Sequence, residues 1–515
     1  MVRKKGLWLA NCPQQQNYRQ IPDCYRVMGK SLQFCCHIMV QYFKLGSWDR
    51  LIILLILFGI MQAPFLLFGD EIQVPELLWI TLGKRLADGW RLYAHIADDT
   101  GPMAALVYAG LAKLGLANFH TLRYAGSALI LVQAFWLNQM ARRYQLMNDR
   151  NFLVAFFYLI FCHLGPDSVT LSPVSMAITF IIAVYSRLFK MIKVGATSDD
   201  AIVLGLALGC AVLCYQPSII FLIPCYASAL FFSGLRINQY LIILVAMLLP
   251  VAGVYTFFHV GGGEQDFWRC FMAHFRVGFL ISWTGWDLVA GLSGILILVS
   301  LAGWVAANRS SRVNFQQIGL SVFFFGLVAA ALEIFPGTTQ STYLLLFLVP
   351  HAAVFAALFM QFSRSVLVQE IYSLLLIIIF MGGFYGMANP SFGKQILGHS
   401  LFVEEPPKGF VANFKNKPIL LLSNDFRYYK YNPPATRFFK FYLSDLGKND
   451  SQTIEGLMYW YHCLAENAPA VIYDPEGFVP PLAVRIPEFG KCYRASFYPH
   501  LYESLPGRRF GKQAR

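Results

Sequence analysis

The sequence is poor in charge: only 13% of its 515 residues are Asp, Glu, Lys or Arg, whereas 57% are hydrophobic and 45 are Phe. This composition excludes an ordinary soluble domain, in which roughly a quarter of the residues are charged. Apolar stretches close to the roughly 20-residue length of a membrane span recur from Leu51 to about Ala388. The chain is therefore predicted to be an α-helical polytopic membrane protein.

Several signals of other protein classes are missing. The 11 cysteines contain no CxxC spacing, and the chain has no fixed-period repeat and no Gly-rich phosphate loop. The basic residues 1–50 lack the apolar core of a signal peptide, so they are predicted to form a cytoplasmic N-terminal tail. A nucleic-acid partner is not expected from the net charge of +13, because Lys and Arg accumulate in short cytoplasmic loops of membrane proteins.

One threading of the chain places its basic loops on a single side of the membrane. It treats residues 103–117, which contain Lys113, as a short juxtamembrane or re-entrant helix. The eleven predicted spans are 51–69, 121–140, 151–166, 170–190, 201–216, 217–234, 240–259, 286–307, 316–335, 342–361 and 370–388. The N-terminus is then cytoplasmic, and residues 70–120 form the first outer loop.

The composition becomes polar and Pro-rich at about Asn389. This change predicts a boundary between a transmembrane domain, residues 51–388, and an extracytoplasmic domain, residues 389–515. Strands are predicted at 417–423, 470–475 and 491–498 and a helix at 453–469, which suggests a small α/β domain. If this domain faces an oxidising compartment, Cys463 and Cys492 could form a disulfide; two free thiols are the alternative.

Two pairs of carboxylates lie at membrane boundaries of the first outer loop. Asp70 and Glu71 follow the first span, and Asp98 and Asp99 precede the short helix. An acid after a span commonly marks the membrane surface or caps the next helix. Two pairs in one loop exceed what topology requires. Because a carboxylate near hydrocarbon costs a few kcal/mol unless it is solvated or paired, the cluster predicts a cavity or a cation.

This loop, GDEIQVPELLWITLGKRLADGWRLYAHIADDTGPMAALVYAGLAKLG at residues 69–115, resembles the first outer loop of the GT-C membrane glycosyltransferases. Among these are the protein O-mannosyltransferases and the lipid A aminoarabinose transferases. The resemblance extends to GPDSV at 165–169 and to two C-terminal segments, KPILLLSNDFRYYKYNPPATRFFKFY and PAVIYDP. It implies transfer of a sugar from a polyprenyl-phosphate donor to a lipid, glycan or protein acceptor. The expected location is the outer face of a bacterial inner membrane, with an endoplasmic-reticulum membrane as the alternative.

The family places the base just beyond the first span, which by position implies Asp70. Glu71, Asp98 and Asp99 would orient the acceptor or a divalent metal, with Asp70 and Asp98 as the candidate metal ligands. A leaving phosphate calls for cations or a metal. The candidate substrate-binding residues are Asp167, Lys84, Arg85, His95, Arg269, His274, Arg276 and Tyr343. For each basic residue, ordinary snorkelling to the interface is the competing interpretation.

Two positions depart from the family pattern. Relatives often have Lys-Pro-Pro where this chain has Thr100, Gly101 and Pro102, and Arg-Tyr where Thr342 precedes Tyr343. The loss of these cations leaves open a catalytically silent relative that binds glycolipid. A transporter or flippase of lipid-linked saccharide is another alternative, and it would require functional charges within the spans and inverted repeats.

Overall fold

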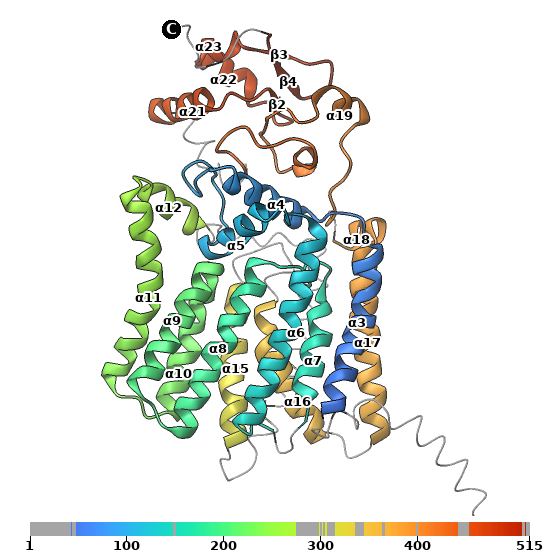
Figure 1. Cartoon of the computed structure of the whole chain (residues 1–515), viewed down its shortest axis with the longest axis vertical. Helices are drawn as coiled ribbons and strands as arrows, with labels where there is room; N and C mark the ends of the chain where they lie inside the picture. The colour runs from blue at the N-terminus through green and yellow to red at the C-terminus, as the bar shows by residue number, and fades with distance from the viewer. Residues whose placement is uncertain are drawn as a thin grey trace, which may run out of the picture.

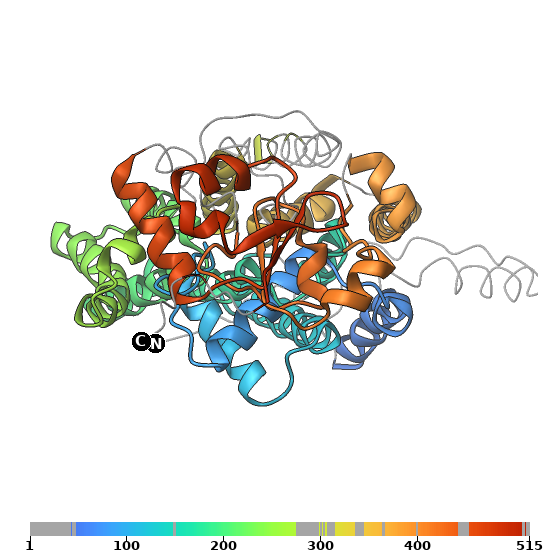
Figure 2. The same ribbon diagram turned by 90° about the horizontal axis from the view of Figure 1, so that it is seen from above.

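The computed structural model describes residues 48–147, 151–273, 315–334, 345–362, 366–397, 400–440 and 453–506, together with a few isolated positions. A bundle of roughly parallel helices forms its larger part (Figure 1). Helices α4 and α5 lie across one end of this bundle, and the C-terminal region, residues 400–506, lies above them. Seen from above, the C-terminal region covers that end of the bundle (Figure 2).

The described bundle helices follow the apolar runs of the sequence. They are α3 (Trp48–Phe68), α6 (Phe119–Arg143), α7 (Leu153–Phe161) with η1 (Cys162–Leu164), α8 (Pro173–Val194), α9 (Ser198–Cys214), η2 (Gln216–Phe221) with α10 (Leu222–Phe232), α11 (Ile237–Val260), α15 (Phe315–Ile334), α16 (Leu348–Phe362) and α17 (Val366–Ala388). The predicted span 286–307 lies outside the described residues apart from isolated positions. The count of eleven spans therefore stays a prediction.

Length and composition allow four described helices to cross a membrane: Arg50–Leu67, Pro173–Val194, Ile237–Val260 and Leu367–Ala388. The apolar surface of α11 suits contact with lipid, since only 17% of its most apolar window is buried. The interior of the bundle is aromatic. The ring of Phe157, for example, lies 5.0 Å from that of Phe355 and 5.2 Å from that of Phe359.

Two helices lie over the end of the bundle that faces the C-terminal region. Helix α5 (Pro102–Lys113) confirms the short helix predicted at 103–117, and a proline at its first position suits a helix start. Helix α4 (Val74–Ala87) was not predicted. The two helices pack through stacked rings of Trp79 and Tyr108, whose centroids are 5.7 Å apart. Helix α12 (Glu264–Phe271) lies at the same end of the bundle (Figure 1).

The C-terminal region contains a mixed four-stranded sheet. Its strands are β1 (Ile419–Leu421), β2 (Val471–Tyr473), β3 (Tyr493–Ala495) and β4 (Leu501–Ser504), in the order β1-β2-β4-β3. β1 and β2 are parallel, with the predicted helix α21 (Ile454–Glu466) between them in the chain, and the other two pairs are antiparallel. The other helical segments there are α19 (Lys408–Phe414), η4 (Phe426–Lys430), α22 (Val479–Arg485) and α23 (Pro487–Gly490).

The strands predicted at 417–423, 470–475 and 491–498 are confirmed, whereas β4 was not predicted. Cys463 and Cys492 pack against the same apolar cluster and are both free thiols in the structure. Helix α18 (Pro390–Leu397) connects the end of the bundle to this region.

Candidate functional site

The turn between α3 and α4 carries Asp70 at the end of α3 that faces the C-terminal region. Just after Asp70, the backbone pairs with the C-terminal region. Val403 N donates to Ile72 O at 2.9 Å, and Val74 N donates to Leu401 O at 3.0 Å. The chain that follows the candidate base is therefore fixed by residues more than 300 positions away.

A buried arginine of α6 holds the same turn. Arg123 is fully buried and donates to the backbone carbonyls of Gly69 and Glu71, the latter at 2.6 Å. It also binds the carboxylate of Glu76 through two hydrogen bonds, Nε to Oε1 at 2.8 Å and Nη2 to Oε2 at 2.9 Å. Asp70 lies between the two held carbonyls, and the side chains of Asp70 and Glu71 are both exposed.

Glu76 is the buried anion of this arrangement. Burial raises the pKa of Glu76, while the bonds from Arg123 and from Gln73 N, at 3.0 Å, oppose that rise and favour the carboxylate. The charge of Asp167 also raises the pKa of Glu76, so Asp167 lies close by. Asp167 is itself buried. The structure thus places this predicted substrate contact near the interior ion pair.

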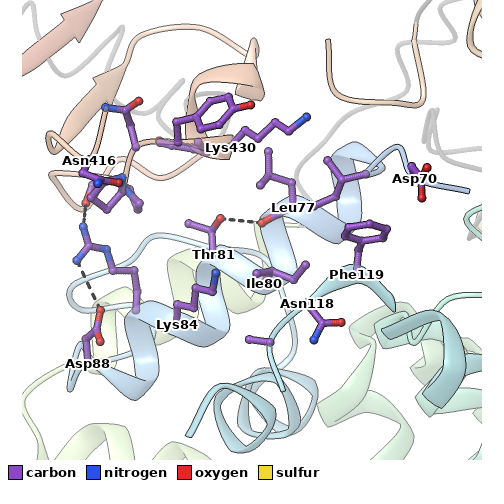
Figure 3. A pocket seen from close by; sticks show the side chains of 18 residues that line it. Asp70, Leu77, Ile80, Thr81, Lys84, Asp88, Asn118, Phe119, Asn416 and Lys430 are labelled. Carbon is purple, nitrogen blue, oxygen red and sulfur yellow. Dashed lines mark hydrogen bonds and ion pairs between the residues drawn. The ribbon is translucent and has the colours of Figure 1, made fainter. Parts of the chain in front are cut away.

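A pocket of about 460 Å³ lies between α4 and the C-terminal region (Figure 3). Asp70 is at one end of its lining, and Asp88, at the end of α4, is at the other. Lys84 is exposed along the same helix. The remaining lining residues are Ile72, Leu77, Ile80, Thr81, Arg85, Ala117, Asn118, Phe119, Asn416, Tyr429, Lys430, Tyr431, Asn432, Pro433 and Pro434. Cavities of this size suit small-molecule or saccharide ligands.

Arg85 fastens α4 to the opposite wall of this pocket. Its Nη2 donates to the backbone oxygen of Pro434 at 2.6 Å. Its guanidinium carbon lies 4.7 Å from the ring centroid of Trp90, and its Nη1 lies 3.8 Å from the carboxylate of Asp88. The guanidinium of Arg85 is therefore already bound to other parts of the protein. Lys84, on the same helix, has an exposed side chain.

The second acidic pair is bound to a lysine of the C-terminal region. Lys440 Nζ lies 3.2 Å from Asp98 Oδ1 and also forms an ion pair with Asp99. The side chain of Asp98 is 1% exposed and that of Lys440 is 7% exposed. Thr100 N donates to Asp98 at 2.6 Å. Burial raises the pKa of Asp98, and the ammonium of Lys440 opposes that rise.

Lys440 belongs to an irregular segment, residues 433–440, that we call the strap. The strap pairs with β1, where Ala435 N donates to Ile419 O at 2.8 Å. It also contacts the segment between α4 and α5, where Ala97 N donates to Arg437 O at 3.0 Å, and α12, where Arg437 forms an ion pair with Asp266. The strap therefore connects the sheet to the loop that carries both acidic pairs.

Of the five predicted acids, Asp70 is the one that lines this pocket, and Glu71 is not part of its lining. Asp98, Asp99 and Asp167 are also absent from its lining.

Of the other predicted contacts, His95 is exposed, and its Nδ1 accepts a hydrogen bond from Arg91 N at 3.2 Å. Arg269 is exposed on α12. His274, Arg276, Thr342 and Tyr343 lie outside the described residues.

The proposed metal ligands do not form a metal site. Within the parts of the chain that the structure describes, no group of three His, Cys, Asp or Glu side chains could hold an ion. Asp98 already accepts hydrogen bonds from Lys440 and Thr100, and it does not line the pocket of Asp70. Since a divalent ion needs several converging oxygen or nitrogen ligands, Asp70 and Asp98 do not fit one.

Three residues of this arrangement were not predicted: Glu76, Arg123 and Lys440. Arg123 had a usable signal, because an arginine within a predicted span must find a partner. The partner of Arg123 is 47 positions earlier, and Lys440 is 342 positions from Asp98. No local pattern connects residues at such separations.

Comparisons with known proteins give structural matches but no match of sequence. No protein-family model and no protein of curated function matches the chain. The fold is similar to the crystal structure of ArnT from Cupriavidus metallidurans bound to undecaprenyl phosphate, with a TM-score of 0.56 and 12% identity over 90% of this chain and 99% of that chain. Apo ArnT gives a TM-score of 0.51 and 11% identity, over 84% of this chain and 94% of that chain.

A weaker similarity, with a TM-score of 0.43 and 12% identity, links 81% of this chain to 60% of the oligosaccharyltransferase AglB from Archaeoglobus fulgidus, solved with an inhibitory peptide and a dolichol-phosphate. ArnT and AglB are both GT-C membrane glycosyltransferases. The resemblance to ArnT, at 12% identity, shows a shared fold. The GT-C resemblance seen in the sequence is thereby confirmed for the fold.

Proposed function

We propose that this chain is a GT-C membrane glycosyltransferase that moves a sugar from a polyprenyl-phosphate donor to an acceptor on the outer face of the membrane. One observation carries the proposal. The exposed carboxylate of Asp70, which follows the end of α3, lines a pocket of about 460 Å³ in a fold shared with ArnT, which was solved with undecaprenyl phosphate.

The proposed reaction is a single displacement with Asp70 as the base. An acceptor hydroxyl attacks the anomeric carbon of the donor sugar, and its proton passes to the Asp70 carboxylate as the new C–O bond forms. The bond from the anomeric carbon to the phosphate oxygen breaks, and its electron pair leaves with polyprenyl phosphate. Because one displacement occurs, the anomeric configuration inverts.

Two lysines that line the pocket are suited to stabilise the negative charge of the leaving phosphate. Lys84 projects from α4, and Lys430 comes from the C-terminal region, where it pairs with Glu405. Preorganised cations near a leaving phosphate lower the barrier because they stabilise charge that develops in the transition state. No step is assigned to a metal, since the acids in the described parts of the chain form no ligand group for one.

The proposed topology follows the charge-consistent threading. Eleven spans, a cytoplasmic N-terminus and an outer domain from residue 389 onward place Asp70 and the pocket on the outer face. A bacterial inner membrane is the proposed location, and an undecaprenyl-phosphate sugar is the corresponding donor. The C-terminal region forms one wall of the pocket, through Asn416 and residues 429–434, so it would help to select the acceptor.

A catalytically silent glycolipid-binding protein is the second candidate. The observation that favours it is the placement of Asp98 and Asp99, which are engaged by Lys440 and do not line the pocket of Asp70. On this alternative the fold and pocket bind a lipid-linked saccharide without transferring the sugar.

The test compares wild-type, Asp70→Asn and Asp199→Asn proteins in native membranes. Asp199 is an exposed acid in the first turn of α9, at the opposite end of the bundle, and serves as the matched control. Undecaprenyl phosphates that carry labelled mannose, glucose or 4-aminoarabinose are added, and both release of undecaprenyl phosphate and transfer of label are measured. We expect Asp70→Asn to slow transfer by about 10²- to 10⁴-fold and Asp199→Asn to leave it unchanged. Transfer at the wild-type rate by an intact Asp70→Asn protein would remove the base assignment. No transfer by the wild-type protein from any donor would favour the silent relative.

A further inference from the structure

We infer that Arg123 is a positioning residue for the proposed transfer, and that with Glu76 it forms a clamp that fixes the turn carrying Asp70. This inference rests on the proposed function for its catalytic consequence. The clamp itself consists of contacts in the structure, so it can be tested apart from activity.

The guanidinium of Arg123 uses all three of its nitrogens. Nε and Nη2 bind the carboxylate of Glu76, Nη2 also donates to Glu71 O, and Nη1 donates to Gly69 O. Asp70 is the residue between these two carbonyls. Fixing both peptide groups restricts the backbone torsions on either side of Asp70 and so restricts where its carboxylate can point.

The surroundings of Arg123 are shaped to hold a planar guanidinium. Its central carbon lies 4.4 Å from the ring centroid of Phe65 and 4.9 Å from that of Phe119. A Cβ at Gly69 would overlap the backbone oxygen of Phe65 and would lie 2.8 Å from Nη1 of Arg123. Glycine at position 69 therefore permits the close approach that the clamp requires.

Helix packing alone does not explain this arrangement. The side chains of Arg123 and Glu76 are 1% and 0% exposed, so both charges lose their hydration. A well-packed apolar pair would join α4 and α6 without that loss and is often as stable or more so. An apolar pair could not hold the carbonyls of residues 69 and 71. The charged pair therefore adds the hydrogen bonds from Arg123 that fix the backbone of residues 69 and 71.

The catalytic consequence concerns the placement of the base. The Asp70 side chain is exposed, so the pocket contributes little to its orientation beyond what the backbone imposes. Displacement of a reacting group by about 1 Å can slow an enzyme about a hundredfold. We expect loss of the clamp to lower kcat and to leave the KM for the acceptor nearly unchanged, because the clamp does not line the pocket.

The key variant is Arg123→Lys, which keeps the positive charge and loses the fork of donors. Glu76→Gln is the second variant, because it keeps acceptor oxygen for Arg123 and removes the charge. The double variant Glu76→Arg with Arg123→Glu restores opposite charges but places no donor at position 123 for the two carbonyls. The matched control is Arg142→Lys, at the other end of α6, where the guanidinium carbon of Arg142 lies 5.2 Å from the ring centroid of Phe152.

The first readout is transfer kinetics with the undecaprenyl-phosphate sugar that the wild-type protein uses. We expect Arg123→Lys and the charge-swapped double variant to lower kcat about a hundredfold with the acceptor KM within about threefold of wild type. Arg142→Lys should match the wild-type protein. Recovery of the wild-type rate in the charge-swapped protein would show that the ion pair alone suffices, which overturns the positioning role.

The second readout is hydrogen–deuterium exchange of the peptide covering residues 66–79 in lipid nanodiscs. Gln73 N–H, which donates to Glu76, reports the clamp directly. We expect exchange in this peptide to rise at least about tenfold in Arg123→Lys and to stay unchanged in Arg142→Lys. If Arg123→Lys does not fold, Glu76→Gln gives the same comparison.

The two readouts separate the clamp from the proposed function. Faster exchange together with no transfer by the wild-type protein from any donor would retain the clamp and remove the glycosyltransferase proposal. Unchanged exchange in both Arg123→Lys and Glu76→Gln would overturn the clamp, whatever happens to kcat. Faster exchange with an unchanged kcat would overturn the positioning role.

Discussion

Replacement of Lys440 by Met is expected to release the strap from the segment between α4 and α5, which carries Asp98 and Asp99. Met has nearly the length of Lys and carries no charge, so the substitution removes the ammonium that binds Asp98 and Asp99 while it fills most of the same volume. The adjacent hydrogen bond from Ala97 N to Arg437 O, at 3.0 Å, should then open more often.

The magnitude follows from the burial of the pair. The side chains of Lys440 and Asp98 are 7% and 1% exposed, and removal of one partner of a buried pair costs about 3–5 kcal/mol. Burial already raises the pKa of Asp98, so Asp98 can relieve part of this cost by taking up a proton once Lys440 is absent. We therefore expect a cost at the lower end of this range, about 3 kcal/mol. This cost corresponds to roughly a hundredfold increase in the equilibrium constant for opening of the hydrogen bond from Ala97 N.

The assay is hydrogen–deuterium exchange of the Ala97 amide at neutral pH, compared among wild-type, Lys440→Met and Lys430→Met proteins. Lys430 pairs with Glu405, whose side chain is 61% exposed, and such exposed pairs contribute at most about 1 kcal/mol. Asp98→Asn in the Lys440→Met background should restore part of the protection, because it removes the unpaired carboxylate. If Lys440→Met accelerates Ala97 exchange no more than Lys430→Met does, the buried pair does not hold the strap.

Three further predictions concern Asp98 and the two cysteines of the C-terminal region. Burial raises the pKa of Asp98 above its unfolded value of about 3.9, so the folded protein binds the carboxyl proton more tightly than the unfolded chain does. The stability that this proton contributes is fully present below a pH of about 3.9 and is lost as the pH rises through the pKa of the folded state. The thermal midpoint of Asp98→Asn, compared with that of wild type, should therefore rise between pH 4 and pH 7, and a fall would contradict the sign. Burial also raises the pKa of Cys463, so its thiol should react with iodoacetamide at pH 7.5 more slowly than in the unfolded chain. Peptide mass spectrometry of protein unfolded without reductant should find Cys463 and Cys492 both alkylated, and recovery as a disulfide would contradict the structure.

Elements with a local signal were predictable from the sequence. Pro102 followed by an apolar run marks the start of α5, and short β-branched or apolar runs mark β1 and β2. Helix α4 also has local signals that the prediction did not use: Pro75 and Glu76 lie in its first turn, and Lys84 and Arg85 lie in its last turn. Several of its buried side chains belong to a cluster shared with the C-terminal region. Its position depends on packing partners that lie hundreds of residues later.

The candidate site was predictable only in outline. The cost of a carboxylate near hydrocarbon required a cavity or a cation for the acidic cluster, and the structure contains both. Asp70 lines the cavity, and Asp98 and Asp99 bind a cation. The prediction joined the two pairs into one site with a metal because it contained no information on Lys440, which reaches the loop only through the strap.

The strap also supplies a cation close to Thr100, one of the two positions at which the sequence differs from the family pattern. The family that the sequence resembles often has a lysine near that position, and in this chain the ammonium beside the second acidic pair belongs to Lys440 instead. Neutralisation of Asp98 and Asp99 by Lys440 thus depends on docking of the C-terminal region. The same docking forms the wall of the pocket opposite α4. Since Arg85 and Ala97 on the loop bind the backbone of Pro434 and Arg437, both dependences involve the same short segment. A displacement of the strap would therefore open the pocket and at the same time expose the buried carboxylate of Asp98, so the geometry around Asp70 cannot be understood from the transmembrane helices alone.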